Sequence, residues 1–171
     1  MSLTLLHDVM LDPIAREEYL AHEYMSPEEG AVEVYRDRLW HPHDLAVYQR
    51  LLRGVAGTLR RWPEVQRLIV IGGGCGWEGA LLSRWLPSLR QVLILDIGWC
   101  VLRLVPDTWA HVGAATPVQP VLADFTTLPL RRCGPDTVGL AFRYLHHAHD
   151  ITATVRALQS VLCRLILVEP V

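Results

Sequence analysis

The chain has 171 residues, of which 51% are hydrophobic and 20% are charged, and its formal net charge is −2 at pH 7. This composition excludes a disordered chain, and the length is sufficient for one domain with a sizeable buried core. The small net charge indicates no general affinity for nucleic acid or for an anionic membrane, so we expect neither as a partner. The sequence contains no Lys, which excludes a lysine base or a lysine Schiff base.

The cysteines and the N-terminus indicate the cellular compartment. Cys75, Cys100, Cys133 and Cys163 lie at least 25 residues apart and form no Cys-x-x-Cys pair, which is typical of a reducing environment. The N-terminus lacks the basic region of a signal peptide, and no apolar run approaches the length of a membrane span. We therefore expect a cytoplasmic protein.

Three helices are predicted before the first long strand. Residues 1–11 read as an irregular arm, and capping patterns with Pro at the first helical position predict helices over about 12–24 and 26–40. A third helix, over about 44–61, has apolar residues at helical spacing. We expect residues 1–64 to form a helical cover over the glycine-rich edge of a single domain, with residues 65–171 as its cofactor-binding core.

A glycine-rich turn organises the rest of the chain. Leu68 to Ile71 is an unbroken apolar run, typical of a strand that is buried on both faces. Four glycines follow at 72, 73, 74 and 76, and then a helix that ends before Pro87. A second apolar run, over 91–96, ends in Asp96, whose carboxylate is placed to accept hydrogen bonds from both hydroxyls of a ribose.

Strands and helices continue to alternate up to the C-terminus. A short helix is expected over 98–105, a loop over 106–117 and a helix from Asp150 to about Leu162. Further strands are expected over 118–122, 136–142 and 164–168. The fold class is therefore α/β: a Rossmann-like parallel sheet of about five strands in the order 3-2-1-4-5, with helices on both faces and an N-terminal helical cover.

These segments resemble the successive motifs of class I S-adenosylmethionine-dependent methyltransferases, over roughly the last three-fifths of the chain. The matching segments are Gly72-Gly-Gly-Cys-Gly76, Leu95-Asp96-Ile97, Ala123-Asp124-Phe125, Tyr144-Leu-His-His147 and Leu165-Ile-Leu-Val-Glu169. The resemblance implies the transfer of a methyl group from S-adenosyl-L-methionine to a small-molecule acceptor by direct displacement.

The resemblance also implies roles for particular residues. The glycine loop would hold the methionine part of the cofactor, Asp96 would bind the ribose, and an acid after the third strand would accept the adenine amine. Residues assigned to cofactor binding on this basis are Gly72, Gly74, Gly76, Asp96, Ile97, Asp124, Phe125 and Phe142.

One departure concerns the position two residues before Gly72, where many family members carry an acid and this chain has Val70. Glu78 is a candidate to replace that acid. The run from Val70 to Gly74 also resembles aminopropyltransferases, which bind a decarboxylated cofactor on the same fold. Those enzymes have an Asp-rich segment after the fourth strand, whereas this chain has Arg143-Tyr-Leu-His-His. The methyltransferase is therefore favoured over an aminopropyltransferase-like enzyme.

A second departure is the end of the chain. The family sheet continues beyond the fifth strand with a helix and an antiparallel hairpin, which this sequence lacks, so residues 165–168 are expected to form an apolar edge strand. We expect a homodimer or a partner chain to cover that edge. This departure also supports an alternative function, that of a non-catalytic methyltransferase-like subunit that binds a partner protein.

The catalytic candidates follow the fourth predicted strand. His146 or His147 could remove a proton from the acceptor, because histidine titrates near neutral pH, and Tyr144 could position it. The alternative, that one histidine packs and caps while the others are solvated, remains open. No acid lies at the spacing of a known metal-ligand set, so no metal site is predicted.

Overall fold

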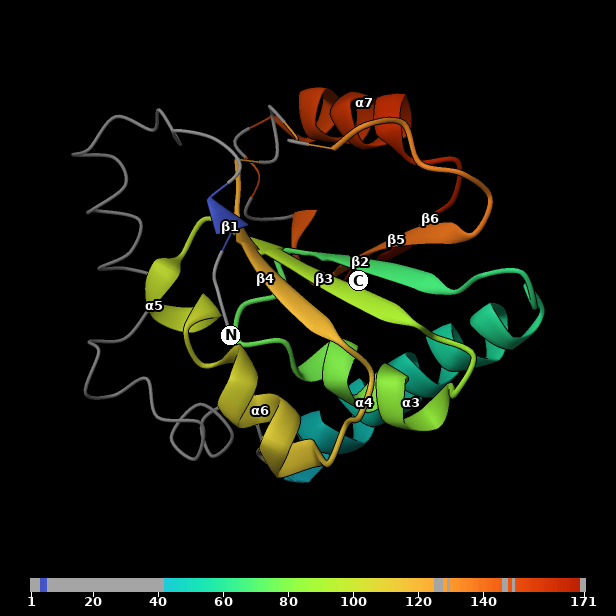
Figure 1. The fold of residues 1–171 in the computed structure, drawn as a ribbon, viewed down its shortest axis with the longest axis vertical. Coiled ribbons are helices and arrows are strands. Elements are labelled where there is room, and N and C mark those ends of the chain that lie inside the picture. The colour runs from blue at the N-terminus through green and yellow to red at the C-terminus, as the bar shows by residue number, and fades with distance from the viewer. Residues whose placement is uncertain are drawn as a thin grey trace.

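In a computed structural model, the residues described are 4–5, 42–124, 128, 130–145, 148 and 150–169. They form a parallel β-sheet with helices packed on both of its faces (Figure 1). The helices predicted over 12–24 and 26–40 lie outside the described residues. Within those residues, no helix combines the length and the apolar character needed to cross a membrane.

Among the described residues the sheet contains six strands, and every neighbouring pair is parallel. In sheet order they are β1 (Thr4–Leu5), β4 (Val118–Leu122), β3 (Gln91–Asp96), β2 (Arg67–Ile71), β5 (Thr137–Phe142) and β6 (Leu165–Val168). From β4 to β6 this is the predicted order 3-2-1-4-5, which confirms the predicted Rossmann-like fold class.

The short strand β1 was not predicted. Thr4 pairs with Val121 and Leu5 with Leu122, so the prediction of an irregular arm over 1–11 is wrong for these two residues. The edge of β4 presents backbone N–H and C=O groups that need partners, and a passing segment can satisfy them. A strand this short carries no periodicity that a sequence pattern could reveal.

The central strands are apolar on both faces, as their sequences predict. In β2, Leu68 and Val70 contribute to one hydrophobic cluster, while Ile69 and Ile71 contribute to the other. All six residues of β5 are buried. Burial on both faces explains why these strands read as continuous apolar runs without alternation.

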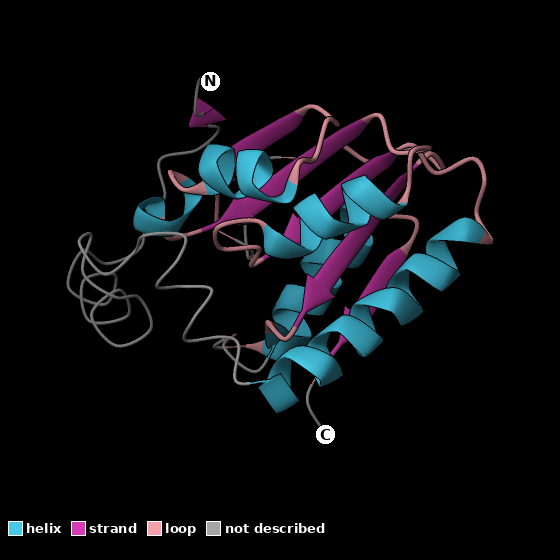
Figure 2. Ribbon diagram, turned by 90° about the horizontal axis from the view of Figure 1, so that it is seen from below, coloured by secondary structure: helices cyan, strands magenta, loops and turns pink. Residues whose placement is uncertain are grey.

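Helices cover the two faces unequally (Figures 1 and 2). The first face carries α3 (Pro42–Arg60), α4 (Trp77–Trp85) and α6 (Val105–Val112), and the other carries α7 (Ile151–Val161). The short helix α5 (Trp99–Leu102) follows β3. Asp150 caps α7 as predicted, because its carboxylate accepts a 2.8 Å hydrogen bond from the Ala153 N–H.

Helix α3 lies in a different place from the one predicted. Its residues Leu52, Val55, Ala56 and Leu59 join the hydrophobic cluster that contains Leu68, so the helix packs on a face of the sheet. The expectation that this helix lies over the glycine-rich edge is therefore wrong for its apolar stripe. Such a stripe is buried most completely against the broad apolar face of the sheet.

The loop predicted over 106–117 is also wrong for most of its length, because α6 occupies Val105–Val112. Pro106 lies in the first turn of this helix, where a missing N–H costs nothing, so it does not break the helix. Trp109 is buried beside Gly76 and Gly79, and its indole N–H donates a 2.9 Å hydrogen bond to the Thr116 carbonyl. The helix ends at Gly113, which has φ 72°.

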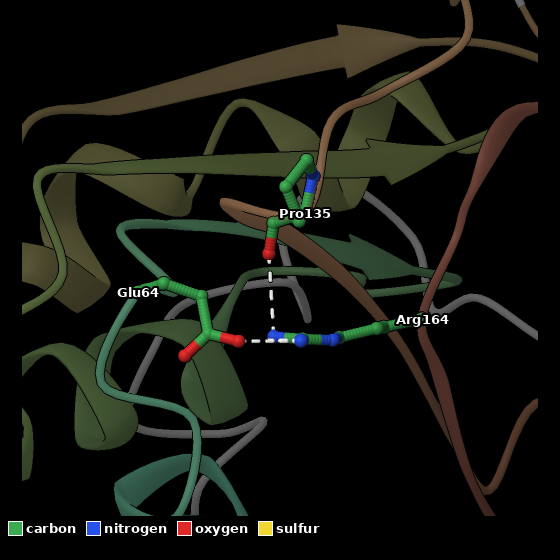
Figure 3. A network of polar contacts seen from close by, with 3 residues as sticks. All are labelled: Glu64, Pro135 and Arg164. Atoms are coloured by element: carbon green, nitrogen blue, oxygen red, sulfur yellow. Dashed lines mark hydrogen bonds and ion pairs between the residues drawn. The ribbon is translucent and has the colours of Figure 1, made fainter.

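A polar contact joins distant segments at the opposite edge of the sheet from the glycine turn (Figure 3). The Arg164 guanidinium forms an ion pair with Glu64 and donates a 3.3 Å hydrogen bond to the Pro135 carbonyl. It also lies 5.1 Å from the centre of the Trp62 ring. These contacts connect the chain before β2 to the start of β6.

Candidate functional site

The carboxyl ends of the parallel strands converge on one edge of the sheet, which is where ligands bind in open α/β folds. Polar residues and a glycine lie at or just after these ends. Gly72 directly follows β2, Arg143 follows β5 and Glu169 follows β6, whereas Asp124 is the second residue after β4 and Asp96 is itself the last residue of β3.

The glycine turn has the backbone conformation that its sequence predicts. Gly72, Gly74 and Gly76 have φ values of 63°, 50° and 87°, a region that favours glycine. Gly76 directly precedes α4, and its N–H donates a 2.7 Å hydrogen bond to the Gly73 carbonyl. At Gly72 the Tyr144 ring lies so close that a Cβ would be 2.0 Å from its Cδ2. Glycine is therefore required at position 72 by both conformation and packing.

The Asp96 carboxylate is buried beside this turn, with 1% of the residue exposed. Its Oδ2 accepts a 2.8 Å hydrogen bond from the Gly74 N–H, and its Oδ1 accepts a 2.7 Å hydrogen bond from the Gly98 N–H. A carboxylate oxygen can accept more than one hydrogen bond. The residue therefore fixes the glycine turn, and its ribose role stays a prediction.

Glu78, in the first turn of α4, places a second carboxylate at this edge. Burial raises the pKa of its carboxyl group, and the Asp96 carboxylate adds to the rise. A backbone N–H, a hydrogen bond from the Tyr48 side chain and the positive charge of Arg143 act in the opposite direction and lower the pKa. Glu78 is half-buried, and its carboxyl group interacts with the Asp96 carboxylate, the Arg143 guanidinium and the Tyr48 side chain.

The turn after β5 is held by the acid that follows β6. Arg143 has φ 54°, the only positive φ of a non-glycine residue in the described ranges. The Arg143 N–H donates a hydrogen bond to the Val168 carbonyl. Glu169 Oε1 accepts hydrogen bonds from the N–H groups of Tyr144 and Leu145, at 2.9 Å and 2.6 Å. Glu169 therefore fixes the backbone that carries Arg143 and Tyr144.

The other residues predicted for cofactor binding differ in how deeply they are buried. Ile97 is partly buried and packs against the cluster on the α7 face, and Asp124 is also partly buried. Phe142 is buried in the core, and its ring meets that of Tyr48 edge-on at 5.2 Å between centroids. Phe125, His146 and His147 lie outside the described residues.

Nucleophilic or metal chemistry gains no support from the described groups. Burial raises the pKa of the Cys75 thiol, which keeps it protonated, so it behaves as a small apolar residue in the turn. In the ranges that the structure describes, no group of three His, Cys, Asp or Glu side chains could hold a metal ion.

Sequence reasoning assigned no role to Tyr48, Arg143 or Glu169. Tyr48 belongs to a helix whose position was predicted differently, and its contacts with Glu78 and Phe142 depend on tertiary packing. No sequence pattern marks a positive φ at an arginine. Glu169 was recognised only as the residue after a strand, although its place at the carboxyl edge was a usable signal.

Comparison with solved structures finds the same fold in several methyltransferases. Magnesium protoporphyrin IX methyltransferase of Synechocystis PCC 6803, solved with bound SAH, has a TM-score of 0.65 and 16% identity, over 90% of this chain and 69% of that one. A SAM-dependent methyltransferase from Aquifex aeolicus has a TM-score of 0.62 and 14% identity, over 85% of this chain and 73% of that one.

A third similar structure is the protein solved in complex with the Haloferax volcanii Trm112 methyltransferase activator. Its TM-score is 0.55 at 18% identity, over 80% of this chain and 54% of that one. The chain spans 50% and 59% of the length of two further solved structures with this fold.

The sequence itself matches no family model and no curated protein. At identities of 14% to 18%, the structural likeness shows the fold alone. The chain therefore has the fold of class I S-adenosylmethionine-dependent methyltransferases, which the order of its motifs predicts.

Proposed function

We propose that the chain binds S-adenosyl-L-methionine at the carboxyl edge of the sheet and transfers its methyl group to a small-molecule acceptor. The observation that carries the proposal is the buried Asp96 carboxylate, which is fixed by the Gly74 and Gly98 N–H groups beside a glycine turn. A carboxylate at the end of a strand on this edge suits the hydroxyls of a ribose, because each of its oxygens can accept more than one hydrogen bond.

Residues at the carboxyl edge of the sheet would each bind or react with a different part of the ligands. When bound, the cofactor supplies an electrophilic methyl group on a sulfonium. Asp96 would accept hydrogen bonds from the ribose, Asp124 would accept one from the adenine amine, and the Ile97 and Phe125 side chains would contact the adenine ring. His147 or His146 would take the proton of the acceptor, with Tyr144 positioning that base.

Binding of S-adenosylhomocysteine to the purified chain, measured by calorimetry, tests the proposal. We expect a single saturable site, because the product shares the adenosine and amino-acid parts of the cofactor. The absence of binding at millimolar nucleoside would overturn the proposal. Release of labelled S-adenosylhomocysteine from labelled cofactor, in the presence of a set of small nucleophiles, then tests for transfer.

A second candidate is a non-catalytic subunit that binds a partner chain. Leu167 in β6 is 44% exposed, and in the described part of the chain no strand pairs with the outer side of β6. Val70 is a buried apolar residue at a position where the resemblance implies an acid. The similar Haloferax volcanii protein was solved with an activator. Nucleoside binding without methyl transfer to any acceptor would favour this candidate.

An aminopropyltransferase-like enzyme is the third candidate. It would need acidic side chains after β5 to hold an amine substrate, and Arg143, Tyr144 and Leu145 occupy the start of that segment. The methyltransferase is favoured because the first side chain there is a cation.

A further inference from the structure

Two cysteines lie side by side at the amino ends of the last two strands, at the edge of the sheet opposite the glycine turn. Cys133 precedes β5, and Cys163 precedes β6. These strands are parallel neighbours, so the segments that lead into them meet at this edge. The Cys163 Sγ donates a 3.3 Å hydrogen bond to the Cys133 carbonyl, across a separation of 30 residues in the sequence. The fold therefore brings together two thiols that the sequence keeps apart.

Backbone contacts hold the two segments against each other. The Cys133 N–H donates a 2.7 Å hydrogen bond to the carbonyl of Val161, the last residue of α7. The Arg164 guanidinium donates a 3.3 Å hydrogen bond to the Pro135 carbonyl (Figure 3). Each cysteine thus lies within two residues of a hydrogen bond that joins the segments, which limits how far the two can separate.

The two sulfur atoms can approach each other through side-chain rotation. A carbonyl oxygen lies about 2.4 Å from the Cα of its own residue, so the Cys163 Sγ is within about 6 Å of the Cys133 Cα. The Cys133 Sγ donates its own hydrogen bond, of 3.4 Å, to the Arg131 carbonyl. Each thiol therefore donates to a backbone carbonyl. A change of rotamer would exchange these two weak hydrogen bonds for one covalent bond.

This pair is accessible to a dissolved oxidant, in contrast to Cys75. Cys163 is exposed and Cys133 is half-buried, whereas Cys75 is 1% exposed. Burial raises the pKa of the Cys133 thiol, although the charge of Arg67 acts in the opposite direction. The exposed Cys163 is therefore the thiol that an oxidant meets first, and Cys133 is the thiol that reacts second.

We propose that Cys133 and Cys163 form a reversible intramolecular disulfide when the chain meets a small disulfide such as oxidised glutathione. The Cys163 thiolate attacks one glutathione sulfur, forms a mixed disulfide and releases one glutathione thiolate. The Cys133 thiolate then attacks the Cys163 Sγ, forms the protein disulfide and releases the second glutathione thiolate. Two protein thiols are oxidised, one glutathione disulfide is reduced, and the two protons pass to the released glutathione. This modification does not depend on the proposed function.

The disulfide would act on the unit that contains β5 and α7, because both elements lie between the two cysteines in the sequence. A bond that closes such a loop restricts the unfolded chain and so stabilises the folded one. We expect the oxidised chain to unfold at a urea concentration higher by about 1 M or more than the reduced chain. A dithiol reductant should reverse the shift.

Thiol counting and peptide mapping test the proposal. The reduced chain has four thiols, and after incubation with oxidised glutathione a thiol count in denaturant should find two fewer. Mapping without reductant should give one linked pair of peptides, containing positions 133 and 163. Cys133→Ser should stop at a glutathione adduct on Cys163, and oxidised glutathione should not raise its urea midpoint. Cys75→Ala, which removes a buried thiol, should form the same link as the wild type.

Three results would overturn the proposal. One is a wild-type chain that keeps all its thiols or stops at the glutathione adduct. Another is a covalent dimer that persists in Cys133→Ser, because the partner of Cys163 would then belong to a second molecule. The third is a link that forms as readily in the urea-unfolded chain, because the fold would then not favour it. All three leave the proposed function standing, since no measurement here involves a nucleoside.

Discussion

Asp96 combines a structural role with the ligand role proposed for it. Because both oxygens accept backbone N–H groups, Asp96→Asn turns an amide donor toward one of those donors. We expect the variant to lose about 1–3 kcal/mol of unfolding free energy, and to bind S-adenosylhomocysteine about tenfold more weakly or worse. Urea unfolding and calorimetry measure the two effects separately.

The matched control for this change is Asp107→Asn, which alters an exposed acid in the first turn of α6. It should shift stability by less than about 1 kcal/mol and leave nucleoside affinity unchanged. Equal effects of the two substitutions on either measurement would contradict a special role for Asp96.

Glu78 predicts a dependence of stability on pH. Its folded pKa is raised by burial, so its contribution is most favourable below pH 4.5, the ordinary pKa of glutamate, and is lost as pH rises through the folded value. Glu78→Gln, which cannot ionise, should therefore be more stable than the wild type at neutral pH. The difference should disappear in acid, as followed by the urea midpoint from pH 4 to pH 8.

The exposed residue Glu64 provides a control, because its pKa is shifted in the opposite direction to that of Glu78. A backbone N–H and the Arg164 side chain lower its pKa, so its contribution is present above the ordinary value and is lost as pH falls through the folded value. Glu64→Gln should thus be slightly less stable than the wild type near neutral pH, and equal to it in acid. A pH-independent difference in both variants would refute the argument.

At the scale of elements, close approach of α4 to β3 depends on Gly79. A Cβ at this position would lie 2.8 Å from Ile94 Cδ1 and 2.9 Å from the Trp109 ring. We expect Gly79→Ala to lose about 1–3 kcal/mol of unfolding free energy, because the core must shift to accept the methyl group. Thermal or urea unfolding measures the loss.

Gly57 in α3 is the matched control, because it is an exposed helical glycine with nothing within 4 Å of the place that an alanine methyl group would occupy. Gly57→Ala should raise stability by about 0.5–1 kcal/mol, since alanine has the higher helix propensity. The same substitution in two helices thus has opposite expected signs. Destabilisation of both variants to the same extent would contradict the packing argument.

The elements that sequence reasoning located best are the buried strands. The strands β3 (Gln91–Asp96) and β4 (Val118–Leu122) have the predicted bounds, because a run of four apolar residues marks β3 and Pro117 directly precedes β4. Helix α6 was missed because a loop was predicted from residue 106 onward, although a proline such as Pro106 suits the first turn of a helix. A local sequence pattern therefore predicts an element correctly only where each residue fits one kind of structure, and proline fits both a loop and the first turn of a helix.

Some residues of the candidate site could also be predicted from the sequence, and others could not. The glycine turn and Asp96 could be predicted because they follow strands whose parallel pairing places them at one edge. The cluster of Tyr48, Glu78 and Arg143 could not, because it depends on where α3 packs and on a backbone conformation that arginine rarely adopts. Tertiary packing decides such contacts, and no single segment encodes it.

At the scale of the whole molecule, the described chain leaves β6 at an edge of the sheet. β6 pairs with β5 on one side, and its four residues are apolar, with Leu167 44% exposed. Nothing within β6 supplies a charge, a proline or a bulge that would prevent further pairing. An unprotected apolar edge of this kind favours association with another chain.

We expect the chain to form a homodimer through β6, since small homo-oligomers most often assemble about a two-fold axis. Light scattering at low micromolar concentration should give about twice the monomer mass of 19.3 kDa. Leu167→Lys places a charge at the edge and should yield a monomer. Ile151→Lys, at the 51% exposed start of α7, should leave the dimer intact. A monodisperse wild-type species of 19.3 kDa would exclude the dimer and leave the edge to another part of this chain or to a different partner.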